Sequence, residues 1–357
     1  MAGRRAYLDY NASAPLRESA RAAVVDALET VGNPSSVHAE GRAARRLVEE
    51  ARRDVAALAG ASAANVFFTS GATEAASALL TPDWRLGRGV VRASRLYVSA
   101  ADHPCILCGG HFAPADIEII PVDRDGLVDL EILEARLAAH DRSAGIPLVA
   151  IHAANNETGV VQPMSAIAAA AKAAGGVSIL DAVQAAGRIP LDIADVGADF
   201  FILSSHKIGG PKGVGAIVSA SDLMMPAPLV RGGGQERGHR AGTENVPGIA
   251  GFAAAAREAR DGLARAGEIA AMRDRFEAAL VAREADAEIF GHAAPRLANT
   301  SFFALPGIKA ETAQIAFDLA GVALSAGSAC SSGKVGPSHV LKAMGRGDTA
   351  GALRVSI

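Results

Sequence analysis

Short apolar runs alternate with longer amphipathic segments over most of the chain. The apolar runs predict buried strands at residues 66–69, 96–99, 117–120, 148–151, 177–180, 200–203 and 215–218. Helical periodicity lies between them, at residues 39–59, 129–140 and 165–174. Runs that are apolar on both faces suit a sheet covered by helices on each side. The pattern therefore predicts an α/β fold, with a large domain built on a seven-stranded, mainly parallel sheet.

The pattern changes toward the C-terminus. A stretch rich in alanine, glutamate and arginine predicts one long helix over residues 247–283. Short strands are expected after it at 299–305, 322–324 and 352–356, with a helix at 311–320. We interpret this part as a smaller α+β domain. The expected division assigns residues 14–255 to the large domain and residues 1–13 and 256–357 to the small one.

Composition and charge narrow the class of protein. Of 357 residues, 50% are hydrophobic and 20% are charged, which is ordinary for a globular protein, and the net charge of −3 indicates no nucleic-acid or membrane partner. No apolar run reaches the roughly 18 residues that span a bilayer, and the first ten residues lack the apolar core of a signal peptide. Three cysteines are too few for a disulfide framework. We expect a cytoplasmic protein.

One lysine stands at the end of a predicted strand. Lys207 closes the sequence Ser-Ser-His-Lys, directly after the apolar run 200–203, and ligands of such sheets sit beyond the carboxyl ends of the strands. A lysine that is desolvated there loses its proton more easily and becomes a nucleophile, as Schiff-base chemistry requires. The chain has only six lysines, and Lys207 is the best placed of them to bind an aldehyde.

Polar residues follow the other predicted strands as well. Residues 70–74 open a helix whose free amides suit an anion, or form a glycine turn capped by Thr73. Asp181 could pair with a protonated pyridine nitrogen, or cap a helix. His103 could stack on a flat ring and move protons, or lie on the surface. Asn155 could face the ring, or form a turn.

Three further residues complete this set. Gln184 lies one turn beyond Asp181 and could donate to a ring oxygen, and Ser204 and His206 could add donors to a phosphate. Together these positions place an anion site, an acid, an imidazole, an amide and a lysine at successive strand ends. Those are the parts of a pocket for pyridoxal 5'-phosphate.

Two loops and a cysteine pair have more than one interpretation. The glycine- and arginine-rich segment 231–245 suits a loop that grips an anion, or a flexible surface loop. Cys330 lies among glycines and serines, where its thiolate could attack a substrate or be inert. Cys105 and Cys108 could form a redox or metal pair, but no second cysteine pair completes a zinc site. We predict two reduced cysteines on a helix and no bound metal.

These motifs, taken in order, resemble the cysteine desulfurases of the nitrogen-fixation and iron–sulfur-cluster-assembly type, within the class V aminotransferase group. The resemblance runs along nearly the whole chain. It rests on residues 7–12, 33–36 with His38, 69–74, 155–159, 181–184, 204–207, 231–245, 327–330 and 353–356.

The resemblance implies a fold type I transferase that binds pyridoxal 5'-phosphate and forms a homodimer. It implies that Lys207 binds the cofactor covalently and moves the Cα proton, while His103 stacks over the ring. Arg354 would bind the substrate carboxylate through a bidentate pair, with Asn155 nearby. The implied cofactor-binding residues are Ala72, Thr73, Asn155, Asp181, Gln184, Ser204, His206 and Lys207, with Thr243 from the other subunit.

The implied reaction removes sulfur from L-cysteine. Cys330 would accept that sulfur as a persulfide, leaving L-alanine, and would pass it to an acceptor such as an iron–sulfur scaffold protein. Two alternatives stay open at the level of sequence. One is a relative that acts on selenocysteine or another amino acid, such as a class V aminotransferase, and the other is a weakly catalytic sulfur-transfer scaffold.

Overall fold

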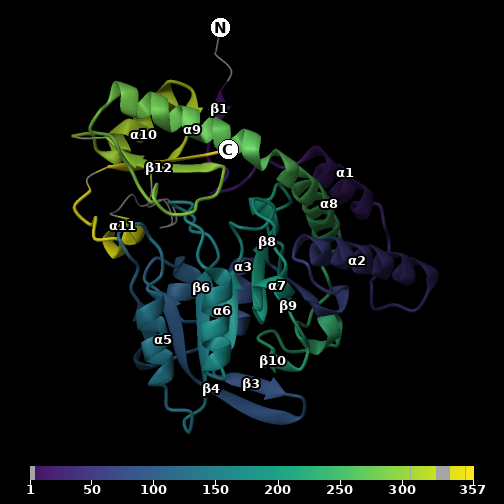
Figure 1. Cartoon of the computed structure of the whole chain (residues 1–357). Helices are drawn as coiled ribbons and strands as arrows, with labels where there is room; N and C mark the ends of the chain where they lie inside the picture. The colour runs from purple at the N-terminus through teal and green to yellow at the C-terminus, as the bar shows by residue number, and fades with distance from the viewer. Residues whose placement is uncertain (1–4, 306, 327–337, 350) are drawn as a thin grey trace.

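A large mixed sheet lies at the centre of the computed structural model, which describes residues 5–305, 307–326, 338–349 and 351–357 (Figure 1). In spatial order its strands are β10 (Met224–Pro226), β3 (Asp83–Leu86), β4 (Gly89–Ser99), β6 (Ile146–His152), β7 (Val177–Asp181), β8 (Phe200–Ser204), β9 (Gly215–Ser219) and β2 (Val66–Thr69), and β5 (Ile117–Ile120) also pairs with β4. The pairs β5–β4, β4–β6, β6–β7 and β7–β8 are parallel, whereas the strands at the two ends are antiparallel.

All seven strands that the sequence predicts are present, but the expected strand number is wrong. The described residues form a sheet of nine strands, because β3 and β10 extend it beyond β4. Only Trp84 is buried in β3, and Arg85 beside it is exposed, so this strand carries no apolar run. The first half of β4 pairs with β3 and is likewise mostly exposed. For this reason the apolar pattern predicts a strand only over residues 96–99.

Both faces of the sheet are buried, as its apolar runs indicate. Alternate residues of β8 point to opposite sides, so Phe200 and Ile202 join one hydrophobic cluster while Phe201 and Leu203 join the other. The first cluster includes side chains of α3 (Ala72–Leu79) and α4 (Pro104–Leu107). The second includes side chains of α2 (Ala39–Leu58), α5 (Leu130–Ala138), α6 (Met164–Ala173), α7 (Ile193–Val196) and α8 (Val246–Gly262).

A smaller antiparallel sheet packs above the large one (Figure 1). Its order is β11 (Glu288–Ile289), β12 (Thr300–Ala304), β15 (Ala352–Ser356) and β14 (Ser325–Ala326). Helices α9 (Ala266–Arg283) and α10 (Ala310–Leu319) cover its far side, and α11 (His339–Ala343) lies on the side of the large sheet. The N-terminal arm reaches this region because β1 (Ala6–Tyr7) pairs with β13 (Val322–Ala323). The division at residues 13/14 and 255/256 stays a prediction, and its second boundary falls inside α8.

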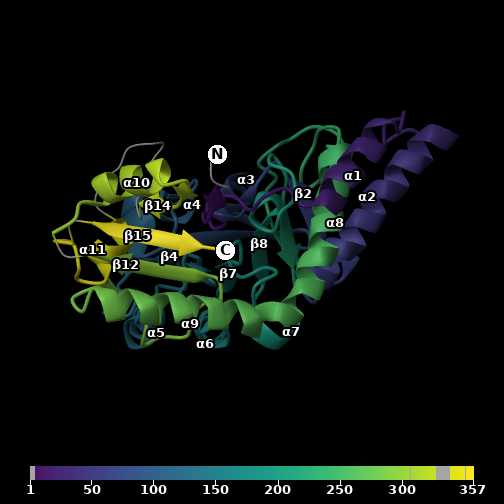
Figure 2. The same cartoon turned by 90° about the horizontal axis from the view of Figure 1, so that it is seen from above.

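The long helix expected over residues 247–283 is two helices. A 3-10 turn at Leu263–Arg265 separates α8 from α9. The helices serve different layers: α8 packs on α2 and on α1 (Glu18–Leu28), whereas Phe276 of α9 packs on Phe303 of the small sheet (Figure 2). The break follows Gly262, where glycine costs about 1 kcal/mol relative to alanine in a helix. The sequence pattern alone does not reveal this change of packing partner.

A buried ion pair fastens the glycine-rich segment 231–245 to the large sheet. Arg52 of α2 donates to both carboxylate oxygens of Glu236, at 2.6 and 2.8 Å, and both side chains are almost fully buried. Arg52 also donates to the carbonyl of Val66, and Glu236 accepts from the amide of Phe68, so both partners also bond β2. The pair therefore fixes where this segment crosses the molecule.

We expect Arg52→Met to lower the free energy of unfolding by about 3–5 kcal/mol, because it leaves the buried Glu236 charge without its partner. Urea denaturation of the cofactor-free protein measures this. Arg53→Met is the matched control: the neighbouring side chain is 63% exposed and lies 3.8 Å from Glu50, so its loss should cost less than about 1 kcal/mol. Equal effects of the two substitutions would contradict the assignment.

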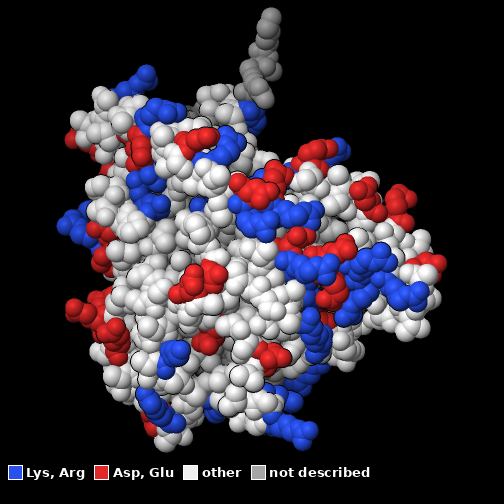
Figure 3. Space-filling model, turned by 45° about the vertical axis from the view of Figure 1, so that its right-hand side comes forward, with Lys and Arg blue, Asp and Glu red and all other residues white. Residues whose placement is uncertain are grey.

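The surface carries mixed charge on the side of α1, α2 and α8, where basic and acidic side chains lie interspersed (Figure 3). This agrees with the small net charge of −3. Within the described ranges, no helix is both long enough and apolar enough to cross a membrane. Nor do the described residues contain three or more histidine, cysteine, aspartate or glutamate side chains grouped to hold a metal ion.

Candidate active site

A cavity of about 520 Å³ opens where the central parallel strands end. Strands β6, β7 and β8 run in the same direction, so the residues that follow them meet at one edge of the sheet. The volume lies in the usual range of small-molecule sites. Eight residues that the sequence analysis selected line this cavity: Ala72, Thr73, His103, Asp181, Gln184, Ser204, His206 and Lys207.

Lys207 lies at the end of a 3-10 turn that directly follows β8. Its Nζ donates to the carbonyl oxygens of Asn11 and Ala12, at 2.8 and 2.9 Å. The side chain is half-buried and lines the cavity. The N-terminal arm thus orients the amine at the place where the sequence predicts an aldehyde-binding lysine.

Asp181 is the last residue of β7 and is buried. Its Oδ1 accepts a hydrogen bond from the backbone amide of Val183 at 3.0 Å. Burial, aided by the negative charge of Asp102, raises the pKa of Asp181 from 3.8 to about 6. The carboxylate therefore holds a proton more strongly than an exposed aspartate, which suits a partner for a protonated ring nitrogen.

The raised pKa of Asp181 has a consequence for stability. The folded protein binds this proton more tightly than the unfolded chain, so ionisation of Asp181 opposes folding as pH rises from about 4 to about 6. We expect the unfolding free energy of cofactor-free Asp181→Asn, relative to wild type, to rise by about 3 kcal/mol over that window. Urea titrations at a series of pH values measure this. The control is Asp195→Asn, at an exposed position on α7, which should have the same pH dependence of the unfolding free energy as wild type. If Asp181→Asn also had the wild-type pH dependence, the expectation would be wrong.

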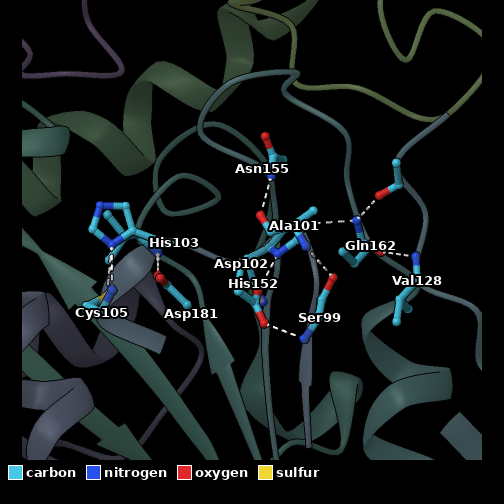
Figure 4. A network of polar contacts seen from close by, with 12 residues as sticks. Ser99, Ala101, Asp102, His103, Cys105, Val128, His152, Asn155, Gln162 and Asp181 are labelled. Carbon is cyan, nitrogen blue, oxygen red and sulfur yellow. Dashed lines mark hydrogen bonds and ion pairs between the residues drawn. The ribbon is translucent and has the colours of Figure 1, made fainter. Parts of the chain in front are cut away.

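His103 caps the N-terminus of α4 and lines the same cavity as Asp181 (Figure 4). Its Nδ1 accepts from the backbone amide of Cys105 at 3.2 Å, so a neutral ring carries its proton on Nε2. Burial, with the nearby Lys207 charge, lowers the pKa of His103 to about 4. The ring is therefore neutral at pH 7 and is able to stack on a flat ligand or accept a proton.

The part of the cavity wall at the start of α3 suits an anion. Helix α3 begins at Ala72, and the positive end of its dipole, with the side chain of Thr73, lies at the cavity wall. Ser204 and His206 line the same cavity, and His206 Nδ1 lies 3.2 Å from the hydroxyl of Ser13. Burial lowers the pKa of His206 to about 4, so it offers a neutral donor. One cavity thus holds an amine, an acid, a flat imidazole and an anion cradle, and these residues fit pyridoxal 5'-phosphate.

Asn155 was expected to face a bound ring, but it does not line the cavity in this structure. Its Nδ2 donates to the carbonyl of Ala101 at 2.9 Å (Figure 4), and its Oδ1 accepts from the amides of Glu157 and Thr158. The side chain thus holds its own turn, and the neighbouring Asn156 lines the cavity instead. The predicted role of Asn155 in binding cofactor and substrate stays a prediction.

Arg354 also lies outside the cavity lining, although it is close to it. Its terminal nitrogens donate to Asp9 at 2.7 Å and to the carbonyl of Asn156 at 2.8 Å, and its side chain is fully buried. Its Nε has no hydrogen-bond partner among the described residues. Thr243 lies outside the lining as well, and Cys330 lies outside the described residues, so these three roles stay predictions.

The structure adds His152 and Lys212 to the cavity, and the sequence alone assigns neither of them a role. Cys105, considered above only as part of a redox or metal pair, also lines the cavity. The predicted strand ends at Ile151, whereas β6 extends to His152. The sequence pattern therefore does not reveal that His152 lies at the end of the strand. Cys105 and Cys108 are free cysteines; Cys105 lies on α4, as predicted, whereas Cys108 directly follows the helix instead of lying on it. Burial raises the pKa of the Cys105 thiol, which keeps it protonated.

Comparison with known proteins agrees with this geometry. The family described as aminotransferase class-V matches residues 6–357. The chain belongs to the class-V aminotransferase family. A cysteine desulfurase of Cereibacter sphaeroides is 40% identical, covering 99% of this chain and 90% of the relative. The cysteine desulfurase IscS of Dictyoglomus turgidum is 37% identical, covering 96% and 86%.

A solved structure extends the family match to the fold. The X-ray structure of a NifS-like protein from Rickettsia africae has a TM-score of 0.88 and 32% identity, covering 99% of this chain and 94% of that chain. The expected fold type I architecture of this class-V aminotransferase is thereby confirmed, and so is the resemblance drawn from its motifs.

Proposed function

We propose that this protein is a cysteine desulfurase that binds pyridoxal 5'-phosphate in the cavity beside Lys207. One observation carries the proposal. Lys207, Asp181 and His103 meet in one cavity, in a chain that is 40% identical over nearly its whole length to a cysteine desulfurase. Amine, acid and imidazole are the groups that this chemistry needs.

Pyridoxal phosphate, when bound, supplies the electron sink that allows the Cα proton of an amino acid to leave. Lys207 would hold the aldehyde end of the cofactor and would carry the Cα proton. Asp181 would accept a hydrogen bond from the ring nitrogen and, with its raised pKa, would favour the protonated ring. His103 would stack on the ring face, and Gln184 would donate near the ring hydroxyl.

Anchoring residues hold the phosphate end. The backbone amides of Ala72 and Thr73 and the hydroxyl of Thr73, at the positive end of α3, would bind the phosphate together with Ser204 and His206. Thr243, which does not line the cavity of its own chain, would contribute to the same phosphate from the partner subunit of a homodimer.

Arg354 and Asn155 bind the carboxylate of L-cysteine, and this requires the guanidinium to exchange part of its bonding to Asp9. The Cys330 thiolate attacks the substrate sulfur. An S–S bond would form as the C–S bond breaks. The substrate would then take a proton at Cβ and regain from Lys207 the proton at Cα, which gives L-alanine. Cys330 then carries a persulfide, which passes to a thiol of an acceptor such as an iron–sulfur scaffold protein in the cytoplasm.

The test is incubation of the holoprotein with L-cysteine, followed by mass analysis of the peptide that contains Cys330. We expect the mass of one added sulfur on that peptide and one alanine released for each persulfide formed. Parallel incubations with selenocysteine, and with alanine plus a 2-oxo acid, distinguish a selenocysteine lyase and an aminotransferase. Cofactor-loaded protein that forms no persulfide would reject the proposal in favour of a weakly catalytic scaffold.

A further inference from the structure

His152 lies at the cavity, and none of the roles above uses it. It ends β6 and is the register partner of Asp181 at the end of β7, so the two side chains leave the same face of the sheet. It is almost fully buried. Its Nδ1 lies 2.5 Å from Oδ1 of Asp102, and its Nε2 lies 3.1 Å from the amide nitrogen of Gln162 (Figure 4).

The orientation of the Gln162 amide is fixed by two backbone groups. Its Oε1 accepts from the amide of Val128 at 2.9 Å, and its Nε2 donates to the carbonyl of Gly126 at 2.8 Å. If the Gln162 amide were flipped, its NH2 group would face the N–H of Val128 and its oxygen would face the carbonyl of Gly126. Gln162 therefore presents an N–H to His152, whose Nε2 has to be an unprotonated acceptor. The imidazole proton is left on Nδ1, where it donates to Asp102.

Asp102 is fully buried and accepts three N–H donors. Oδ1 accepts from the backbone amide and the Nδ1 of His152, and Oδ2 accepts from the amide of Ser99 at 2.7 Å. Three donors stabilise the ionised form of a carboxyl group. A second proton on His152 would face the N–H of Gln162, so the imidazole does not neutralise the charge. The His152–Asp102 pair thus carries one negative charge.

We propose that His152 is a positioning residue that, as a neutral imidazole protonated on Nδ1, maintains a second buried negative charge on Asp102 close to Asp181. The charge state follows from this chain's own hydrogen bonds. Its consequence for catalysis rests on the proposed function. Repulsion between the two carboxylates favours a proton in the hydrogen bond between Asp181 and a ring nitrogen, so the ring stays protonated to higher pH.

The charged and titratable groups that face Asp181 act in opposite directions. Apart from burial, the negative charge of Asp102 raises the pKa of Asp181 and the positive charge of Lys207 lowers it; His152 lowers it only as a cation, a form that the N–H of Gln162 opposes. The amide of Val183 lowers it by donating to the carboxylate. Of these groups, His152 controls the charge of Asp102. Replacing His152 should therefore change the proton affinity of Asp181 through Asp102, while Asp181 itself is unchanged.

The first test uses cofactor-free protein labelled with ¹⁵N-histidine. Proton-coupled ¹⁵N spectra report which ring nitrogen bears the proton, and His152→Gln identifies the signals of His152 by their loss. We expect a protonated Nδ1 and an unprotonated Nε2 at about pH 7. Gln162→Glu replaces the N–H with an acceptor and is expected to add a second proton. His140, which bonds Tyr97, is the internal reference. A wild-type His152 protonated on Nε2 would overturn the proposal.

The second test follows the ¹³C carboxyl signal of Asp181 through a pH titration of cofactor-free variants. His152→Leu removes a donor from Asp102 and destabilises its charge, so the pKa of Asp181 should fall by about one unit. His152→Gln retains an N–H donor and should restore the wild-type value. If His152→Leu does not fold, Asp102→Asn tests the same charge and should produce the same fall.

An unchanged Asp181 titration in the folded variant would sink the inference. Both experiments omit the cofactor and cysteine. An enzyme that formed no persulfide would therefore reject the proposed function while leaving this result standing.

Discussion

Lys207→Ala is expected to abolish the long-wavelength absorbance of the purified holoprotein and to lower the rate of alanine formation by roughly 10³-fold or more. In the proposed mechanism, Lys207 both attaches the cofactor covalently and carries the Cα proton, so the variant would lose both functions. Absorbance spectra and alanine release measure the two losses separately. Borohydride reduction of the wild-type holoprotein should fix the cofactor on the peptide that contains residue 207.

The control for this result is Lys172→Ala. Lys172 is an exposed residue in the last turn of α6, away from the cavity, and its loss should change neither the spectrum nor the rate. A reduced cofactor found on another lysine, or a Lys207→Ala protein that keeps its absorbance, would remove Lys207 from the mechanism.

Cys330→Ala is expected to keep the cofactor absorbance and stop sulfur release. Lys207 and the cavity are intact in this variant, so cofactor binding should not change. Without the thiolate, however, no group accepts the substrate sulfur, and persulfide formation should fall to the background level. Spectra show the first property, and sulfide release with a reducing thiol shows the second.

Cys108→Ala is the matched control. This cysteine is exposed, free and absent from the cavity lining, so its removal should leave sulfur release unchanged. Full activity in Cys330→Ala would contradict the assignment of the nucleophile and would direct attention to Cys105, the thiol that lines the cavity.

The sequence was sufficient for the parts of the fold that are buried on both faces. Strands such as β8 are continuous apolar runs, and their polar successors Asp181 and Lys207 lie at the cavity as predicted. The sequence pattern did not predict β3, where a single buried tryptophan lies among exposed residues. It also did not predict the break between α8 and α9 after Gly262, because that break depends on which sheet each helix covers.

The site shows a similar limit. Asn155 carries the expected motif, but its side chain is used by the turn that it forms, while Asn156 next to it reaches the cavity. The role of His152 depends on Gln162, ten residues away, and on which way an amide points. Such dependence on a specific hydrogen-bond network cannot be derived from residue type and spacing alone.

The anchoring of Lys207 has a consequence for how the protein matures. Its amine bonds the carbonyl of Asn11, and the backbone amide of Asn11 in turn bonds the hydroxyl of Ser356 in β15. Residues made first are therefore held in place by residues made hundreds of positions later. During synthesis, the environment of Lys207 cannot be completed until β15 has left the ribosome. A nascent chain should therefore be unable to bind pyridoxal 5'-phosphate before its synthesis is finished.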